Sequence, residues 1–141
     1  MSKRSADSPL TIADYQSLAR FRYALRTFLR FTEQSARDAG LTPAQHQLLL
    51  AVKGYPGDGP TPLANVADML QLKLHSAGEL ADRAVANGLV TRLVDPDDRR
   101  RVLVELTVQG EHRLRELTVL HRDELRRFEQ EMNAVLRELD R

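Results

Sequence analysis

The chain has no cysteine among its 141 residues, and this absence excludes several kinds of chemistry at once. Disulfide bonds, thiol catalysis, thiol-based redox sensing and zinc sites built from cysteine all need the missing side chain. Tryptophan is also absent, and aromatic residues make up only 5% of the chain. We therefore do not expect an aromatic platform that stacks single-stranded bases.

Long apolar runs are missing as well. No stretch approaches the roughly 20 apolar residues of a membrane-spanning helix, and the N-terminal MSKRSADSPL lacks the apolar core of a signal peptide. We therefore expect a soluble, cytoplasmic protein without a membrane partner. Neither sign of charge is in excess, because 21 basic residues stand against 20 acidic ones and the net charge is +1. Only the distribution of charge can indicate a nucleic-acid partner.

Catalytic and metal-binding patterns are also lacking. The sequence shows no pairing of a nucleophile with a base and no phosphate-binding loop, so we predict no catalytic residue and no cofactor. The histidines include no His-x-x-x-His pair, and the ligand pair at helical spacing is His112 with Glu116. An enzyme and a metal sensor are therefore both disfavoured, and we predict no metal site.

What the chain does contain is a series of helix patterns. Residues 11–37 hold no glycine or proline and have apolar residues at intervals of three or four, which predicts one long helix. Gly40 follows as a C-terminal cap. Thr42, Pro43 and Gln45 have the order of an N-cap, a first-turn residue and a capping-box partner, so we expect a second helix to begin there.

Two shorter helices and a hairpin come next. The segments 62–70 and 73–87 predict helices with apolar residues at helical spacing. In the second of them we expect these residues to face the core: Leu74, Ala77, Leu80, Ala81 and Ala84. The runs 89–94 and 102–106 are rich in β-branched residues and flank a turn, which predicts a β-hairpin. Helix, helix, hairpin is the order of a winged helix-turn-helix, so the expected fold is mainly α with a small β-hairpin wing.

The C-terminal segment from 107 to 141 predicts another long helix. Its apolar residues recur at coiled-coil-like intervals of three and four, and His121 fills one step of the series: Leu114, Leu117, His121, Leu125, Phe128, Met132, Val135 and Leu139. Packing within the chain can account for this seam. An interface between two copies of the chain is the favoured alternative, because a single domain of this size does not readily cover both end helices.

These elements together resemble the MarR family of bacterial transcriptional regulators (multiple antibiotic resistance regulators). Four stretches carry the resemblance in the right order: LTPAQHQLLLAV, LANVADMLQL, ELADRAVANGLVTR and DPDDRRRVLVELTVQG. The resemblance implies one domain of residues 1–141, with a winged helix-turn-helix module at 41–106 and dimerisation helices at 10–38 and 107–141. The implied function is that of a homodimeric regulator, more often a repressor, that binds a pseudo-palindromic operator in double-stranded DNA.

The second helix of the module supplies candidate base contacts on its outward face. Ser76 can bond to either sort of base edge, Lys73 or His75 can donate to guanine, and Glu79 can accept from a cytosine amino group. Arg83 lies further along the same face. An ordinary solvated helix face is the alternative interpretation. Compared with the family, Glu79 stands where an arginine is common.

The hairpin tip holds three consecutive arginines, Arg99, Arg100 and Arg101. A wing beside a helix-turn-helix lies where a minor groove passes, and the negative potential of that groove attracts inserted arginine. In the family pattern an aspartate orients the arginine two positions later, and the matching residues here are Asp98 and Arg100. Arg92, on the first strand of the hairpin, is a further DNA-binding candidate.

Three aspartates accompany these arginines, so a charge-balanced, solvated turn is the alternative for the hairpin tip. Asp95 and Asp98 match the family pattern, whereas Asp97 stands where many members have another arginine. Together with Glu79, it supports a second hypothesis for the chain. In that hypothesis the protein is a helical, dimeric interaction protein that keeps the fold but has lost or weakened operator binding.

In this family a small effector, often an aromatic or phenolic anion, binds between the dimerisation helices and the winged module. The resemblance gives four candidate lining residues: Tyr15, Arg22, Tyr23 and His46. Core packing of the aromatic side chains and solvation of the arginine are the alternatives. Separately, a His121 buried at the dimer interface is a candidate for titration near neutral pH, and a histidine with satisfied hydrogen bonds at that interface is the favoured alternative.

Overall fold

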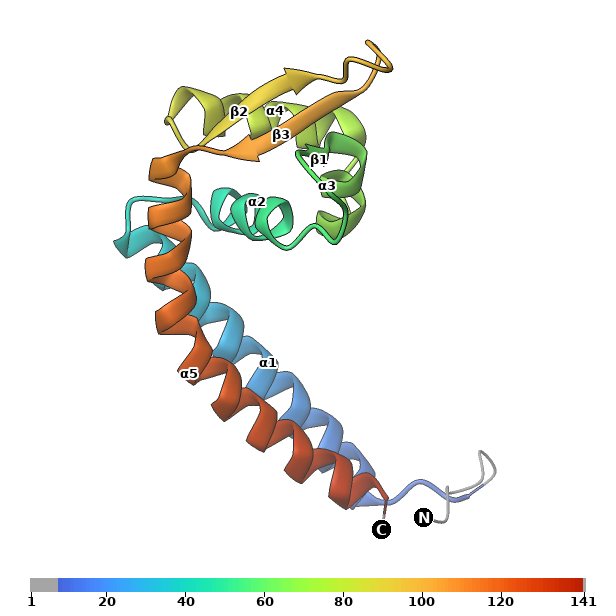
Figure 1. Cartoon of the computed structure of the whole chain (residues 1–141). Coiled ribbons are helices and arrows are strands. Elements are labelled where there is room, and N and C mark those ends of the chain that lie inside the picture. Colours follow the sequence, from blue (N-terminus) through green and yellow to red (C-terminus); the bar gives the residue numbers. More distant parts are fainter. Residues whose placement is uncertain (1–7, 141) are drawn as a thin grey trace. The chain divides into compact units, whose positions relative to one another are not determined.

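The structure is a computed structural model that describes residues 8–140 (Figure 1). The chain forms two compact units. Of the described residues, one unit contains 8–35 together with 119–140, and the other contains 36–118. Helices α1 (Ile12–Asp38) and α5 (Val108–Leu139) are long enough to contribute residues to both units.

In the first unit, α1 and α5 run side by side (Figure 1). Helix α1 begins where Thr11 and Asp14 cap each other: the Asp14 carboxylate accepts from the Thr11 N–H at 2.8 Å, and the Thr11 hydroxyl accepts from the Asp14 N–H at 3.3 Å. Phe28 of α1 stacks on Phe128 of α5 with ring centroids 5.3 Å apart, and Val135 of α5 is buried. Side chains of the predicted C-terminal seam thus pack within the chain.

Polar contacts also join the two helices. The Ser17 hydroxyl, which is buried, donates to the Glu138 carboxylate at 3.3 Å, and Arg20 forms an ion pair with the same carboxylate at 2.6 Å. Many apolar side chains of the two helices remain exposed: Ile12, Tyr15, Leu18, Tyr23, Val119, Leu120, Leu125 and Leu136. The apolar surface of both helices is therefore only partly covered by their mutual contact.

The second unit contains three helices and a small antiparallel sheet. The helices are α2 (Pro43–Lys53), α3 (Leu63–Leu70) and α4 (Leu74–Ala86). The strands β1 (Thr61–Pro62), β2 (Val90–Val94) and β3 (Val102–Leu106) lie in the order β1-β3-β2. Residues of all three helices and of β3 contribute to its fully buried core, among them Leu48, Leu49, Val66, Ala77, Ala81, Ala84 and Val104. The predicted order of helix, helix and hairpin is confirmed.

The local signals that the sequence gives for helix ends are also confirmed. The Thr42 hydroxyl accepts from the Gln45 N–H, and the Gln45 amide oxygen accepts from the Thr42 N–H, both at 3.1 Å. Gly40 after α1 and Gly88 after α4 have φ angles of +80° and +73°. Only glycine adopts this left-handed conformation at little cost, so both helices end where the sequence predicts.

Two details differ from the sequence-based expectation. Pro62, predicted as the first residue of a helix, instead belongs to β1, because Thr61 and Pro62 pair with β3, a partner more than forty residues away in the chain. The sequence places Leu74 in the core, but its side chain is 57% exposed. The buried face of α4 begins at Ala77, and the first turn of the helix extends beyond the core.

A tight junction connects the end of β3 to α5. The Thr107 hydroxyl donates to the Gly88 carbonyl at 2.6 Å and accepts from the Gly110 N–H at 3.0 Å, while the Thr107 N–H donates to the Leu89 carbonyl at 3.0 Å. A Cβ added at Gly110 would lie 2.0 Å from the Leu89 carbonyl oxygen. The stretch LTVQG at residues 106–110 therefore has a physical basis, because Thr107 caps α5 and Gly110 lets the first turn of α5 pass the Leu89 carbonyl.

Candidate nucleic-acid interface

The outer side of α4 carries the residues that the sequence predicts for base contacts. Lys73 is the N-cap residue, and Lys73, His75 and Glu79 are exposed. Ser76 is half-buried, and Arg83 is exposed one turn beyond Glu79. The N-terminal half of α4 therefore presents hydrogen-bond donors and acceptors that a base edge can meet.

An ion pair connects this helix to the hairpin. Arg92 on β2 donates through Nη1 to the carboxylate of Asp82 on α4. Arg92 is a candidate for DNA contact, and in this structure its guanidinium forms an ion pair with Asp82. The pair ties the first wing strand to α4, although a pair this exposed adds only about 0.2–1 kcal/mol to stability. The sequence gives no signal for it, because the two residues meet only through the packing of the hairpin on α4.

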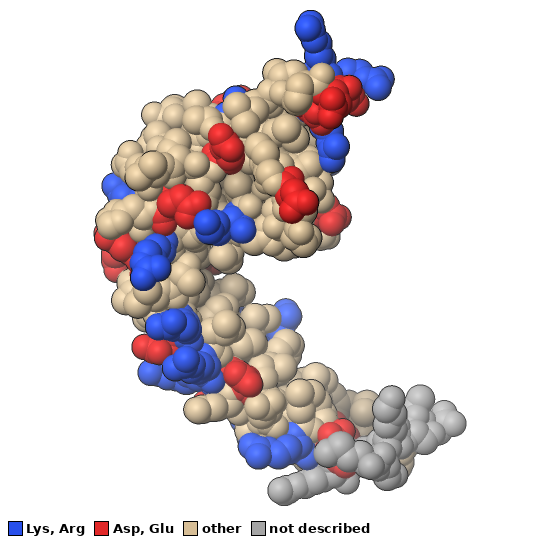
Figure 2. All heavy atoms as spheres, in the orientation of Figure 1, with Lys and Arg blue, Asp and Glu red and all other residues tan. Residues whose placement is uncertain are grey.

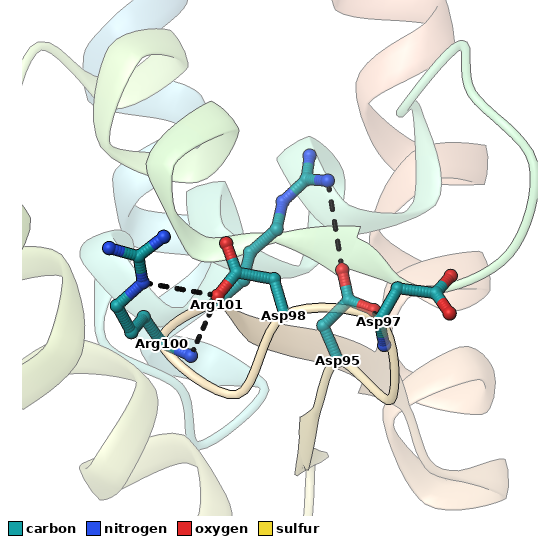
Figure 3. A network of polar contacts seen from close by, with 5 residues as sticks. All are labelled: Asp95, Asp97, Asp98, Arg100 and Arg101. Carbon is teal, nitrogen blue, oxygen red and sulfur yellow. Dashed lines mark hydrogen bonds and ion pairs between the residues drawn. The ribbon is translucent and has the colours of Figure 1, made fainter.

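The wing tip is ordered by its own aspartates (Figure 3). The Asp98 Oδ1 accepts from the backbone N–H of Arg100 at 3.1 Å and from its Nε at 3.3 Å. The Arg100 side chain is nonetheless 92% exposed, so its guanidinium is held at one edge and remains open at the other. The predicted pairing of Asp98 with Arg100 is thus present. Such a contact restricts the arginine rotamers before any ligand binds and lowers the cost of ordering the side chain.

A second aspartate holds the base of the same turn. The Asp95 carboxylate, largely buried, lies 3.7 Å from Nη1 of Arg101 and accepts from the Asp97 N–H at 2.9 Å. The Asp97 carboxylate points away from this network in Figure 3. Within residues 8–140 it forms no hydrogen bond or ion pair. Asp95 and Asp98 therefore organise the turn, whereas Asp97 adds an uncompensated negative charge.

Figure 2 shows how these charges lie on one face of the molecule. Basic side chains project at the tip of the wing, with acidic side chains directly beside them. The net charge of +1 is consistent with this mixture. The wing tip thus offers a local positive group in a molecule without a general excess of positive charge, and any attraction to phosphate depends on that placement.

The four effector candidates differ from one another in their exposure to solvent. Tyr15, Arg22 and Tyr23 are exposed on α1, whereas His46 is buried in α2. Tyr23 lines a small cleft of about 70 Å³ within the first unit. The other lining residues are Ala24, Thr27, Phe28, Glu124, Arg127, Phe128 and Glu131. Tyr15 and Arg22 do not line it.

His121 also lies in the first unit. Its ring meets Phe31 edge to face, with centroids 6.0 Å apart. Desolvation by burial lowers the pKa of His121 below its usual value of 6.5, so burial favours the neutral imidazole.

Within residues 8–140, no group of three or more His, Asp or Glu side chains is placed to hold a metal ion. His112 and Glu116 form an isolated pair at 3.1 Å on α5. Among the same residues, none of the helices is both long and apolar enough to cross a membrane.

Comparisons with known proteins agree with this arrangement. A family model described as MarR family matches residues 39–101. The HTH-type transcriptional repressor NicR of Pseudomonas putida is 32% identical over 116 residues, which cover 78% of this chain and 72% of NicR. The uncharacterized HTH-type regulator YhbI of Bacillus subtilis is 38% identical over 73 residues, 52% of this chain and 47% of YhbI. The chain thus spans about half the length of YhbI.

Solved structures show the same fold. AbsC, a MarR family transcriptional regulator from Streptomyces coelicolor, has a TM-score of 0.72 at 21% identity and covers 86% of this chain, with 81% of AbsC matched. BpsR of Bordetella bronchiseptica, whose DNA binding is regulated by 6-hydroxynicotinic acid, has a TM-score of 0.63 at 26% identity. That match covers 80% of this chain and 83% of BpsR. The mainly helical fold with a small wing is confirmed.

Proposed function

Because the chain belongs to the MarR family of transcriptional regulators, we propose that it represses transcription as a homodimer bound to a pseudo-palindromic DNA operator. The observation that carries the proposal is the wing tip, where Asp98 holds an almost fully exposed Arg100 in a fixed position. The same compact unit exposes the N-terminal half of α4. A major-groove helix and a minor-groove arginine are the two parts that a winged helix-turn-helix uses on DNA.

The relatives support the finer parts of the proposal. NicR is a transcriptional repressor, and BpsR binds DNA under the control of a small aromatic acid. By analogy, we expect α4 to enter the major groove with Lys73, His75 and Ser76 near base edges. Arg100 enters the adjacent minor groove, and Arg99 contacts phosphate. Each phosphate contact steepens the dependence of affinity on salt.

Dimerisation through the end helices is supported by their uncovered apolar surface. Side chains such as Leu18 and Leu125 are 55% and 52% exposed, which is costly for a chain that stays monomeric. A two-fold dimer places two recognition helices about one duplex turn apart, or about 34 Å, and so matches a palindromic site. The proposal further includes release from DNA by a small aromatic or phenolic anion, for which Tyr15, Arg22, Tyr23 and His46 are the candidate residues.

The test begins with selection of bound duplexes from a random-sequence pool, followed by fluorescence anisotropy on the selected site. We expect a palindromic consensus and a dissociation constant on the order of 10 nM at physiological salt. Arg100→Ala should weaken binding at least about tenfold, whereas Arg122→Ala, which removes an exposed arginine of α5, should leave it nearly unchanged.

The same binding assay tests a second candidate function, that of an interaction protein. Glu79 on α4 and Asp97 on the wing are both exposed and both carry the charge that DNA repels. They favour a helical interaction protein that keeps this fold without binding an operator. If no duplex from the pool is retained even at low salt, this second function replaces the first.

A further inference from the structure

Leu74 is the first residue of α4, and its side chain is 57% exposed. Its neighbours on both sides, Lys73 and His75, are exposed as well. Exposed apolar side chains also occur elsewhere in the described chain, as at Leu50 of α2, so exposure alone does not single out Leu74. Leu74 differs from Leu50 in its place at the N-terminal end of the helix proposed to read bases, and one reason for a leucine there would be a contact within the chain.

Packing within the chain does not supply that reason. The buried face of α4 starts one turn later, at Ala77, and continues through Leu80, Ala81 and Ala84. Residue 78, which lies above Leu74 at helical spacing, is a glycine and has no side chain to cover it. The leucine is thus placed at the leading end of the helix, beyond the core and among polar residues that face outward.

The chemistry of the major groove offers a partner for an aliphatic side chain in this position. Base edges there present hydrogen-bond donors and acceptors and one kind of apolar group, the C5-methyl of thymine. Polar residues such as Lys73 and Ser76 suit the donors and acceptors, but Leu74 cannot bond to them. We propose that Leu74 is a specificity-determining residue that contacts a thymine methyl group in each operator half-site. This inference rests on the proposed function, because it requires α4 to enter the major groove.

The experiment replaces thymine by deoxyuridine, one position at a time and symmetrically in both half-sites, in the duplex selected from the random pool. Deoxyuridine keeps every hydrogen-bonding group of thymine and removes only the methyl. Dissociation constants are measured by anisotropy for the wild type, for Leu74→Ala and for Leu50→Ala. Leu50 is a leucine of α2 with a similar exposure of 50%, so its substitution makes the same chemical change outside α4.

We expect one thymine position at which the wild type loses affinity about fourfold per half-site when the methyl is removed. Leu74→Ala should bind the two duplexes equally, and Leu50→Ala should keep the wild-type difference. Because Leu74 is exposed, the variant is expected to fold, which circular dichroism checks.

Two results would overturn the inference while leaving operator binding intact. In one, the wild type binds every deoxyuridine duplex as well as the parent. In the other, Leu74→Ala keeps the full thymine preference, which would assign Leu74 to a protein contact. Failure of the selection to yield any bound duplex would overturn both the proposed function and this inference.

Discussion

At the scale of single residues, the neighbouring aspartates Asp97 and Asp98 of the wing carry the same charge but differ in their contacts with Arg100. Asp98 fixes the backbone and side chain of Arg100, whereas the Asp97 carboxylate points away from the network of the turn (Figure 3). In the proposed complex with DNA, both carboxylates repel the phosphate backbone. Only Asp98 compensates for that repulsion, because it restricts the rotamers of Arg100, the arginine proposed to bind the minor groove.

This difference predicts opposite effects of the same substitution. Asp98→Ala should weaken operator binding by about two- to tenfold, because Arg100 then loses its rotamer restraint. Asp97→Ala should strengthen binding, because it removes a negative charge and no contact. Anisotropy titrations at one fixed salt concentration measure both. Equal strengthening by the two variants would show that charge alone matters at the wing tip.

His121 provides the second prediction at this scale. Its pKa in the folded chain is lowered by desolvation, so the unfolded chain binds a proton more readily than the folded one. The stabilisation from the neutral ring is complete above pH 6.5 and is lost as the pH falls through the lowered pKa. Wild-type stability should therefore drop more between pH 7.5 and pH 5.5 than that of His121→Leu.

Urea unfolding at the two pH values, at one protein concentration, measures this difference. All other titrating groups are common to both proteins, so their contributions cancel in the comparison. Identical pH dependence of the two proteins would contradict a desolvated histidine against Phe31.

At the scale of elements, the junction between β3 and α5 is tightly constrained by hydrogen bonds and by a close backbone contact. The Thr107 hydroxyl donates to the Gly88 carbonyl and accepts from the Gly110 N–H. The Leu89 carbonyl oxygen occupies the position that a Cβ atom at residue 110 would need. The wing and the long C-terminal helix are thus joined without a flexible linker. Gly78 in α4 offers a contrast, because an added Cβ there would meet Leu63 at an ordinary distance of 3.8 Å.

Alanine substitutions at these two helical glycines should therefore have opposite effects. Gly78→Ala should raise the free energy of unfolding by up to about 1 kcal/mol, as expected from helix propensity. Gly110→Ala should lower it by about 1–3 kcal/mol, because a backbone carbonyl must move to admit the new methyl. Denaturant unfolding measures both changes. A stabilised Gly110→Ala variant would mean that the junction opens easily.

The same elements show what a single sequence can predict. Helix ends at Gly40, Thr42 and Gly88 follow from caps within a few residues, so they could be predicted to within one position. The hairpin strands and the pairing of Asp98 with Arg100 are similarly local. In contrast, β1 depends on pairing with β3, and the exposure of Leu74 depends on where the core ends. No local pattern encodes either feature.

The candidate site likewise contains residues that a local sequence pattern identifies and contacts that depend on tertiary packing. Its residue types on α4 and on the wing could be identified from the sequence, because they lie on two continuous segments. Two ion pairs could not be identified from the sequence, because each depends on how a turn or a hairpin packs. They are the pair of Arg92 with Asp82 and the pair of Arg101 with Asp95. The effector candidates come from α1 and α2: Tyr23 lines a cleft of the first unit, and His46 is buried in α2.

At the scale of the whole molecule, the proposed function depends on two copies of the chain. Apolar side chains such as Leu18 and Leu125 remain exposed on the two long helices, where contact between α1 and α5 leaves further apolar surface uncovered. A net charge of +1 gives each copy little general attraction to DNA, so affinity must come from two wings and two recognition helices acting together. A monomer would therefore bind an operator far more weakly than a dimer.

A charged residue within the uncovered face should separate the copies. Leu18→Glu and Leu125→Glu each place a carboxylate among apolar side chains of the proposed interface, where its burial without a partner is costly. Both variants should sediment as monomers at micromolar concentration, and both should lose operator binding although their α4 and wing are intact. Leu50→Glu makes the same change at a leucine of similar exposure on α2 and should remain dimeric. Sedimentation velocity over a concentration series measures the monomer–dimer equilibrium of each variant. If Leu18→Glu and Leu125→Glu both dimerise as strongly as the wild type, the interface lies elsewhere on the chain.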